Sequence, residues 1–329
     1  MTPHTDTLMH MDLSSIVVNH ATKPPRIVVY GDHGIGKTTF ATSAPAPIVI
    51  RTEDGLAAIQ VPTFPIAQSF GDVIAALSTL YSQAHPFQTV VIDTLDWLEP
   101  LIWAHTATLE GKANIEDFGY GKGYTYADEH WRTFLDGLNA LNAKGMTIIC
   151  LAHAKIEKFV APETDAYDRY QLKLHKRAIG LVSEWADVIG FAHQEVFTVD
   201  QEVGGKKVTR GTGGQRRILS VEERPAYDAK NRYSLPPDLD FPKAGAWDVF
   251  ASACAPAFSA PPPMPLNLVP SSPSARSEVT EVQAAANDGT APAHARSDDG
   301  DSVAEINPDL ANAAALGDEL LAVTGGHTE

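Results

Sequence analysis

The sequence predicts an α/β fold with a mostly parallel β-sheet covered by helices on both faces. Three observations predict it. Short runs of apolar, largely β-branched residues recur between residues 25 and 191. Within each run, successive residues are apolar, so both faces of the strand would be apolar, as in strands that are buried on both sides. Stretches with the 3.6-residue periodicity of helices separate them. With 329 residues, 44% of them hydrophobic, the chain can bury such a core.

The elements of this fold follow in order along the chain. Five segments are predicted as strands: Arg26–Tyr30, Ile48–Arg51, Thr89–Asp93, Met146–Ala152 and Asp187–Phe191. Helical patterns between them include Asp72–Gln83 and Tyr126–Ala143. After the fifth strand, Gly204-Gly205 separates Glu195–Val203 from Lys206–Thr209, which predicts a β-hairpin, and Arg217–Val221 adds a further strand.

The composition of the C-terminal part predicts a disordered tail. This part is rich in Pro, Ala and Ser, with Pro-Pro-Pro at 261–263, and buries too little apolar surface to fold. Residues 255–329 carry a net charge of −9, against −7 for the preceding 254 residues. We therefore expect an N-terminal extension over 1–24, a core with its hairpin extension over 25–250, and an acidic tail over 251–329.

Several protein classes are excluded by composition. No stretch approaches the roughly 18 apolar residues of a membrane span, and the first residues lack the apolar run of a secretory signal. Two cysteines, Cys150 and Cys254, provide neither a disulfide framework nor a clustered zinc site. We expect a cytoplasmic protein with no membrane partner.

A phosphate-binding loop is the strongest motif in the sequence. Residues 31–38, Gly-Asp-His-Gly-Ile-Gly-Lys-Thr, satisfy the pattern G-x-x-x-x-G-K-S/T, with a predicted strand before them and a helix after. Glycines let successive backbone N–H groups surround phosphates at the positive end of that helix. Lys37 is expected to reach the β- and γ-phosphates, and the Thr38 hydroxyl to bind Mg²⁺. The predicted nucleotide contacts are Gly31, Asp32, His33, Gly34, Ile35, Gly36, Lys37, Thr38 and Thr39.

Two acidic positions complete the predicted catalytic site. Asp93 ends a buried strand, a position that suits a carboxylate beside bound Mg²⁺; alternatively it caps the next turn, with Asp96 as a substitute. Glu53 directly follows the second strand, and strand ends converge on the phosphate site. We predict Glu53 as the base that activates water, with Asp54 as its substitute; alternatively either residue caps a helix over residues 56–60.

Together these motifs resemble the RecA-type core ATPases, most closely their short phage-encoded version. Those proteins are called phage nucleotide-binding proteins, and some are RecA-like single-strand annealing proteins of the Sak group. The similarity spans roughly residues 25–245, and its segments are Tyr30–Phe40, Arg51–Gly55, Asp117–Tyr124, Leu151–Ala154 and Ala229–Tyr233.

The resemblance implies a strand order and a sensor residue. The strand ending at His153 is expected between the phosphate-loop strand and the Asp93 strand. His153 is expected where these proteins sense the γ-phosphate, although bacterial RecA has glutamine there; alternatively His153 is a hydrogen-bonded strand-end residue. The resemblance also places a mobile DNA-binding loop after His153.

Cations and aromatic rings, the side chains that bind single strands, occur in two candidate segments. The first also contains four acidic residues, so a plain solvated loop is the alternative; the second is otherwise a turn between helices. The predicted DNA contacts are Lys155, Lys158, Arg169, Lys173, Lys176 and Arg177 in the first segment, and Tyr120, Lys122 and Tyr124 in the second.

A late basic pair resembles the Lys-Asn-Lys stretch with which RecA reaches the γ-phosphate of a neighbouring subunit. Lys230 and Arg232 are therefore predicted to stabilise transition-state charge in trans; alternatively they form a basic turn.

The predicted function is that of an Mg²⁺-dependent, DNA-stimulated ATPase of phage recombination, acting in the cytoplasm of a bacterial host. It would form a ring or filament on single-stranded DNA and promote annealing or strand pairing. The acidic tail would repel DNA or bind a partner such as a single-strand-binding protein. The alternatives are a ring helicase or other DNA motor, and an annealing protein that uses ATP only as an assembly switch.

Overall fold

The structure is a computed structural model that describes residues 23–258 except 57, 161, 163, 164, 204 and 205. It describes side chains over the same part, apart from those of residues 196–203, 206–213, 215 and 256–258. Nearly all of the predicted N-terminal extension, and the predicted tail from residue 259 on, lie outside the described residues.

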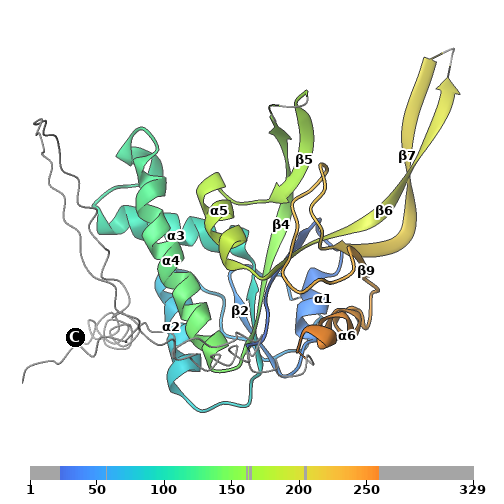
Figure 1. The fold of residues 1–329 in the computed structure, drawn as a ribbon. Coiled ribbons are helices and arrows are strands. Elements are labelled where there is room, and N and C mark those ends of the chain that lie inside the picture. Colours follow the sequence, from blue (N-terminus) through green and yellow to red (C-terminus); the bar gives the residue numbers. More distant parts are fainter. Residues whose placement is uncertain (1–22, 57, 161, 163–164, 204–205, 259–329) are drawn as a thin grey trace, which may run out of the picture. The chain divides into compact units, whose positions relative to one another are not determined.

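A mixed sheet forms the centre of the described part and confirms the predicted fold class (Figure 1). Its main path is β2-β3-β4-β1-β6-β7-β9, and the first five of these strands are parallel. β4 thus lies between β1 and β3, as the resemblance implied. The strands are β1 (Arg26–Gly31), β2 (Pro47–Arg51), β3 (Thr89–Asp93), β4 (Thr147–Phe159), β5 (Tyr167–Leu172), β6 (Val188–Val203), β7 (Lys206–Ser220), β8 (Lys230–Asn231) and β9 (Asp238–Asp240).

Helices cover both faces of this sheet (Figure 1). Along β1, Val28 and Tyr30 belong to the apolar cluster beneath α2, α3, α4 and α5, whereas Ile27 and Val29 belong to the one beneath α1 and α6. This two-sided burial is what the doubly apolar strands predicted. The helices are α1 (Lys37–Thr42), α2 (Phe70–Ser82), α3 (Leu95–Leu109), a 3₁₀ turn (Ile115–Phe118), α4 (Lys122–Ala143), α5 (Lys176–Trp185) and α6 (Ala246–Phe258).

Two long antiparallel ribbons correct the predicted strand ends. β4 does not stop at Ala152 but continues to Phe159 and pairs with β5, so the predicted loop after His153 is a β-ribbon. β6 is continuous, so the predicted fifth strand and the first hairpin arm are one element. β7 is also continuous, so the second hairpin arm and the further strand predicted over Arg217–Val221 are one element as well. Both ribbons extend away from the helices in Figure 1. Cross-strand pairing stabilises these extensions, which the sequence of one strand does not reveal.

The last helix crosses the boundary predicted after residue 250. α6 continues to Phe258 because Phe250 and Cys254 are buried in the cluster beneath α1 and α6. The core therefore ends later than predicted. Within the part of the chain that the structure describes, no helix is both long enough and apolar enough to cross a membrane.

Candidate nucleotide-binding site

The phosphate-binding loop joins the carboxyl end of β1 to the start of α1. Gly34 and Gly36 have φ angles of +73° and +112°, which favour glycine over any other residue. The Lys37 side chain is buried, and its Nζ donates hydrogen bonds of 2.9 Å to the carbonyl oxygens of Gly31 and Asp32. Burial lowers the pKa of Lys37, although neighbouring carboxylates oppose this shift. The loop thus holds a buried ammonium at the site where phosphates are expected.

Thr38 and Asp93 meet beside the loop. The Thr38 hydroxyl donates a 3.1 Å hydrogen bond to Asp93 Oδ2, and Asp93 is only 3% exposed. Burial raises the pKa of Asp93, and the hydrogen bond from Thr38 opposes that shift. A hydroxyl and a carboxylate at one point are oxygen ligands of the kind Mg²⁺ prefers, so these residues fit the predicted metal.

Thr38 and Asp93 line a cavity of about 400 Å³. Glu53 and Asp54 line it together with Lys37, Thr38 and Asp93. Glu53 is partly buried, and this burial raises the pKa of its carboxyl group, whereas the Asp54 side chain is 84% exposed. A carboxylate with raised proton affinity suits a base better than an exposed one does. The remaining lining residues are His33, Gly34, Gly36, Thr39, Gly55, Thr94 and His153.

His153 lies in the middle of β4, in register with Gly31 at the end of β1. It is 6% exposed, and its ring stacks on that of His33 in the phosphate loop, with 3.8 Å between ring centres. Its Nδ1 lies 2.8 Å from Asp96 Oδ2, and its backbone N–H donates to Asp96 Oδ1. Asp96, which was the alternative metal ligand in the sequence analysis, instead forms hydrogen bonds with His153, the predicted γ-phosphate sensor.

The predicted DNA contacts on the first segment differ in exposure. Arg169 is buried and pairs with Glu223 and Asp228, so the description of it as a loop cation is corrected. Arg177 is bound to Asp128 through its Nε and Nη2 atoms. Lys155 donates to the Leu174 carbonyl oxygen at 2.9 Å. The exposed cations on this surface are Lys158, Lys173, Lys176 and Arg177.

The second segment is a turn followed by the start of α4. Tyr120 has a positive φ of 50° and is fully exposed. Lys122 is the first residue of α4 and is exposed. Tyr124 is less accessible, because its hydroxyl donates to Glu116 and its ring stacks on that of His175. The segment therefore presents Tyr120 and Lys122 to solvent, while Tyr124 packs against the body.

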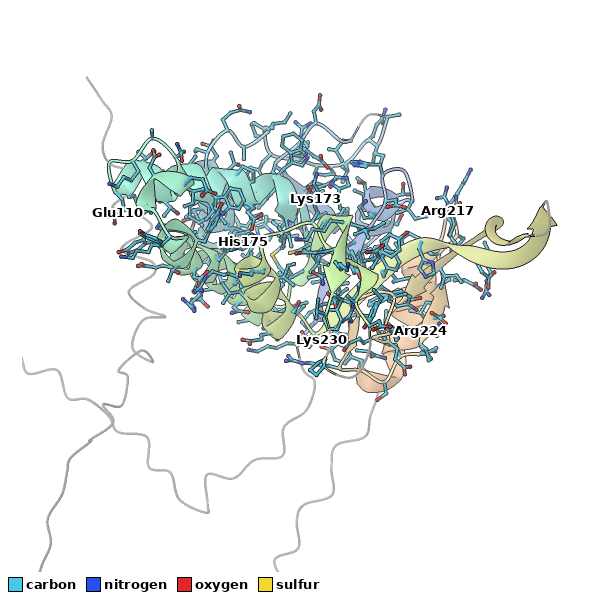
Figure 2. The ribbon with its side chains drawn as sticks, turned by 90° about the horizontal axis from the view of Figure 1, so that it is seen from above. Glu110, Lys173, His175, Arg217, Arg224 and Lys230 are labelled. Carbon is cyan, nitrogen blue, oxygen red and sulfur yellow. The ribbon has the colours of Figure 1, made fainter. Side chains whose placement is uncertain are left out.

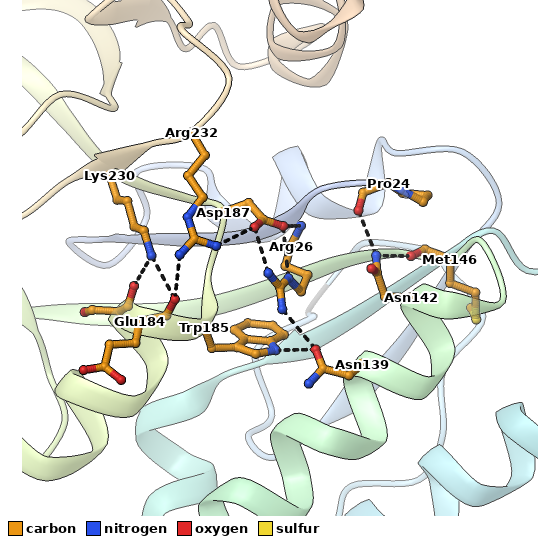
Figure 3. A network of polar contacts seen from close by, with 11 residues as sticks. Pro24, Arg26, Asn139, Asn142, Met146, Glu184, Trp185, Asp187, Lys230 and Arg232 are labelled. Atoms are coloured by element: carbon orange, nitrogen blue, oxygen red, sulfur yellow. Dashed lines mark hydrogen bonds and ion pairs between the residues drawn. The ribbon is translucent and has the colours of Figure 1, made fainter. Parts of the chain in front are cut away.

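Lys230 and Arg232 have partners within the chain (Figure 3). Lys230 Nζ donates to the carbonyl oxygens of Ser183 and Glu184 at the end of α5, and Arg232 binds Asp187. β8 pairs with the start of β6, beside the amino end of β1, so the basic pair lies at the end of the strands opposite the phosphate loop. Within one chain the pair therefore does not reach its own nucleotide site, and the role in trans stays a prediction.

Arg217 contacts the phosphate loop and was not among the predicted site residues. Its Nη1 donates a 2.7 Å hydrogen bond to the Ile35 carbonyl oxygen. In the sequence analysis Arg217 was predicted only as the first residue of the strand Arg217–Val221. The contact joins residues 182 positions apart, and no local pattern reveals it.

Two known proteins are similar to this chain over part of its length. The SPbeta prophage-derived uncharacterized protein YorG of Bacillus subtilis (strain 168) is 25% identical over 185 residues, 54% of this chain. The chain spans about half of that relative, since the match covers 53% of it. Among solved structures, the flagellar accessory protein FlaH from Methanocaldococcus jannaschii matches with 11% identity and a TM-score of 0.34, over 66% of this chain and 86% of that one.

A family match covers the core described above. Residues 23–233 match the family model AAA_24, described as an AAA domain. The matched residues include the phosphate loop, Glu53, Asp93 and His153. The match spans well over half of the sequence. The chain therefore belongs to this AAA domain family, a group of P-loop ATPase domains.

Proposed function

We propose that this protein is an Mg²⁺-dependent ATPase that hydrolyses ATP on single-stranded DNA in phage recombination, where it promotes annealing or strand pairing. The observation that carries the proposal is the cavity in which a buried lysine, a hydroxyl–carboxylate pair and a partly buried glutamate come together. The family membership supports nucleotide use, and the prophage origin of the relative YorG supports the phage setting.

Each group around the cavity has a distinct task in this proposal. Lys37 and the loop N–H groups bind the phosphates, because they supply positive charge at fixed positions beside the cavity. Thr38 and Asp93 hold Mg²⁺, which offsets negative charge on the phosphate oxygens when it is bound. Glu53 accepts a proton from the attacking water, since burial raises its proton affinity. His153, beside the loop and the cavity, senses the γ-phosphate.

Single-stranded DNA is proposed to bind along the β4–β5 ribbon, at the segment that joins β5 to the start of α5, and at the turn before α4. Lys158, Lys173 and Lys176 provide cations there, and Tyr120 with Lys122 provides a ring and a further charge. Lys173 ties this surface to the nucleotide site, because its N–H donates to the His153 carbonyl oxygen at 2.9 Å. A ring or filament of copies on the strand is part of the proposal, as is a single-strand-binding partner for the acidic tail.

ATP turnover with and without single-stranded DNA tests this function. The proposal expects hydrolysis that DNA stimulates, and Lys37→Ala should lose at least about a hundredfold in ATP affinity, since a charged contact to phosphate disappears. Lys112→Ala, which removes an exposed lysine in the loop after α3, serves as the matched control. ATP binding without turnover would favour the assembly-switch alternative, and duplex unwinding would favour the helicase. Unchanged ATP affinity in a folded Lys37→Ala protein would refute the nucleotide site.

A further inference from the structure

Arg217, at the base of the β6–β7 ribbon, contacts the phosphate loop. Figure 2 shows Arg217 at this base. The Arg217 Nη1 atom donates to the Ile35 carbonyl oxygen at 2.7 Å, and a Cβ atom built on Gly36 would lie 3.2 Å from the same nitrogen. Gly36 lines the nucleotide cavity. One guanidinium nitrogen therefore lies against a single peptide unit, the one that joins Ile35 to Gly36.

The sheet fixes the position of this arginine. Arg217 pairs with Gln194 of β6 on one side, and on the other its carbonyl oxygen accepts a 2.9 Å hydrogen bond from the Phe241 N–H. Phe241 is buried and packs on Phe40 of α1, the helix that the phosphate loop opens. The neighbouring Arg216 points to the other face of the strand, because successive side chains alternate, and pairs with Asp240.

The contact has an electrostatic consequence for bound phosphate. The Ile35 carbonyl and the Gly36 N–H belong to one peptide group, and a cation at the carbonyl oxygen polarises the whole group. The polarised N–H is a stronger donor to an anion. The bond also holds the carbonyl oxygen, a partial negative charge, toward Arg217. Both effects favour phosphate binding without any contact between Arg217 and the nucleotide.

We propose that Arg217 is a positioning residue for the nucleotide: it orients and polarises the Ile35–Gly36 peptide, and so links the β6–β7 ribbon to phosphate affinity. The inference rests on the nucleotide-binding part of the proposed function. Because the loop N–H groups surround the phosphates common to both nucleotides, Arg217 should affect ATP and ADP affinity alike. The ribbon then has a route to the nucleotide site, since a shift of β7 would move the guanidinium relative to the loop.

Calorimetric titration of the full chain with ATP and ADP tests this inference. Arg217→Met keeps much of the side-chain volume but removes the donor and the charge, and should weaken both affinities about tenfold, or about 1.4 kcal/mol. Arg217→Lys, which keeps a cationic donor, should recover most of that loss. Arg216→Met is the matched control and should leave both affinities within about twofold of the wild type, since its partners lie on the other face.

The outcomes separate this inference from the proposed function. If the wild type binds neither nucleotide, the proposed function itself fails. If the wild type binds both and a folded Arg217→Met protein binds them equally well, only the positioning role is overturned. A purely structural arginine would lower the melting temperature of Arg217→Met and leave its nucleotide affinities unchanged, which also overturns the role. Should Arg217→Met not fold, Arg217→Gln replaces it, since it keeps polarity and removes the charge.

Discussion

One carboxylate, that of Asp96, holds both the backbone and the ring of His153. Its Oδ1 accepts the His153 N–H at 2.9 Å, and its Oδ2 lies 2.8 Å from His153 Nδ1. Burial raises the pKa of Asp96, but the hydrogen bonds from His153 outweigh burial and leave the pKa below its ordinary value. An ionised Asp96 accepts hydrogen bonds and therefore favours the neutral tautomer of His153 that carries its proton on Nδ1 and leaves Nε2 unprotonated.

This relationship makes Asp96→Asn informative. A neutral amide fixes the ring proton less strongly, so we expect ATP hydrolysis to fall about tenfold while ADP affinity changes by less than about twofold. Calorimetry with ADP and a steady-state turnover assay measure the two quantities. Equal losses for ADP binding and for hydrolysis would show that Asp96 supports the loop as a whole rather than the sensor.

Glu53→Gln should bind ATP normally and hydrolyse it at least about tenfold more slowly, because an amide cannot accept the proton of water. A base works only when deprotonated, so wild-type turnover should fall as the pH drops through the raised pKa of Glu53, above its ordinary 4.5. Asp54→Asn is the control, since Asp54 is exposed and pairs with Arg51. Slow turnover in Asp54→Asn together with normal turnover in Glu53→Gln would show that Asp54, and not Glu53, is the catalytic base.

The sequence predicted the parallel part of the sheet closely, because strands buried on both faces are apolar throughout. Thr89–Asp93 was predicted with the bounds that the structure shows. The phosphate loop, Glu53 and Asp93 line one cavity because parallel strands end at the same edge. In these places local pattern and global fold agree, as expected of a foldable sequence.

The remaining features depend on contacts between distant residues. Residues 154–159 read as a loop because charges are interleaved with rings, yet pairing with β5 makes them a strand. In sequence Arg169 resembles the other cations, but in the structure it is buried and forms ion pairs with Glu223 and Asp228. The contact of Arg217 with the loop likewise exists only once β7 lies beside β6 and β9. Composition does not specify such pairings.

Glu99 offers a test of stability against pH. It is 5% exposed, accepts the His175 N–H, and burial raises its pKa to about 7. Burial of the protonated Glu99 carboxyl group costs less than burial of the carboxylate. The stability that the protonated form contributes is therefore fully present below about pH 4.5 and is lost as the pH rises through about 7. Glu99→Gln does not titrate, so it should gain stability over the wild type across that range, on the order of 3 kcal/mol at most.

Chemical denaturation at pH 5 and pH 8 measures the Glu99 effect. Glu110→Gln, which removes an exposed carboxyl group at the end of α3, is the control and should show little difference between the two values. A difference between Glu99→Gln and the wild type that is equal at both pH values would mean that Glu99 does not titrate in this range.

We expect different results for Lys230 and Arg232 depending on whether they only stabilise their own chain or also act on the nucleotide of a neighbouring subunit. Within the chain, Lys230 binds the last carbonyl groups of α5 and Arg232 binds Asp187, so replacing both by Ala should cost about 1–2 kcal/mol of unfolding free energy. If the pair also acts on a neighbour's nucleotide, DNA-stimulated hydrolysis should collapse beyond what this loss explains. Arg224→Ala, which removes an exposed arginine paired with Asp238, controls for surface charge.

Mixing the double variant with Lys37→Ala decides between these expectations. The double variant is defective only as a donor of cations and Lys37→Ala only as an acceptor, so an assembly of both contains some interfaces that pair an intact phosphate loop with an intact basic pair. Activity should then return in part, because charge on the γ-phosphate is offset again at those interfaces. If light scattering shows that the two variants assemble on DNA and no activity returns at any ratio, the pair acts only within its own chain, as a cap for α5.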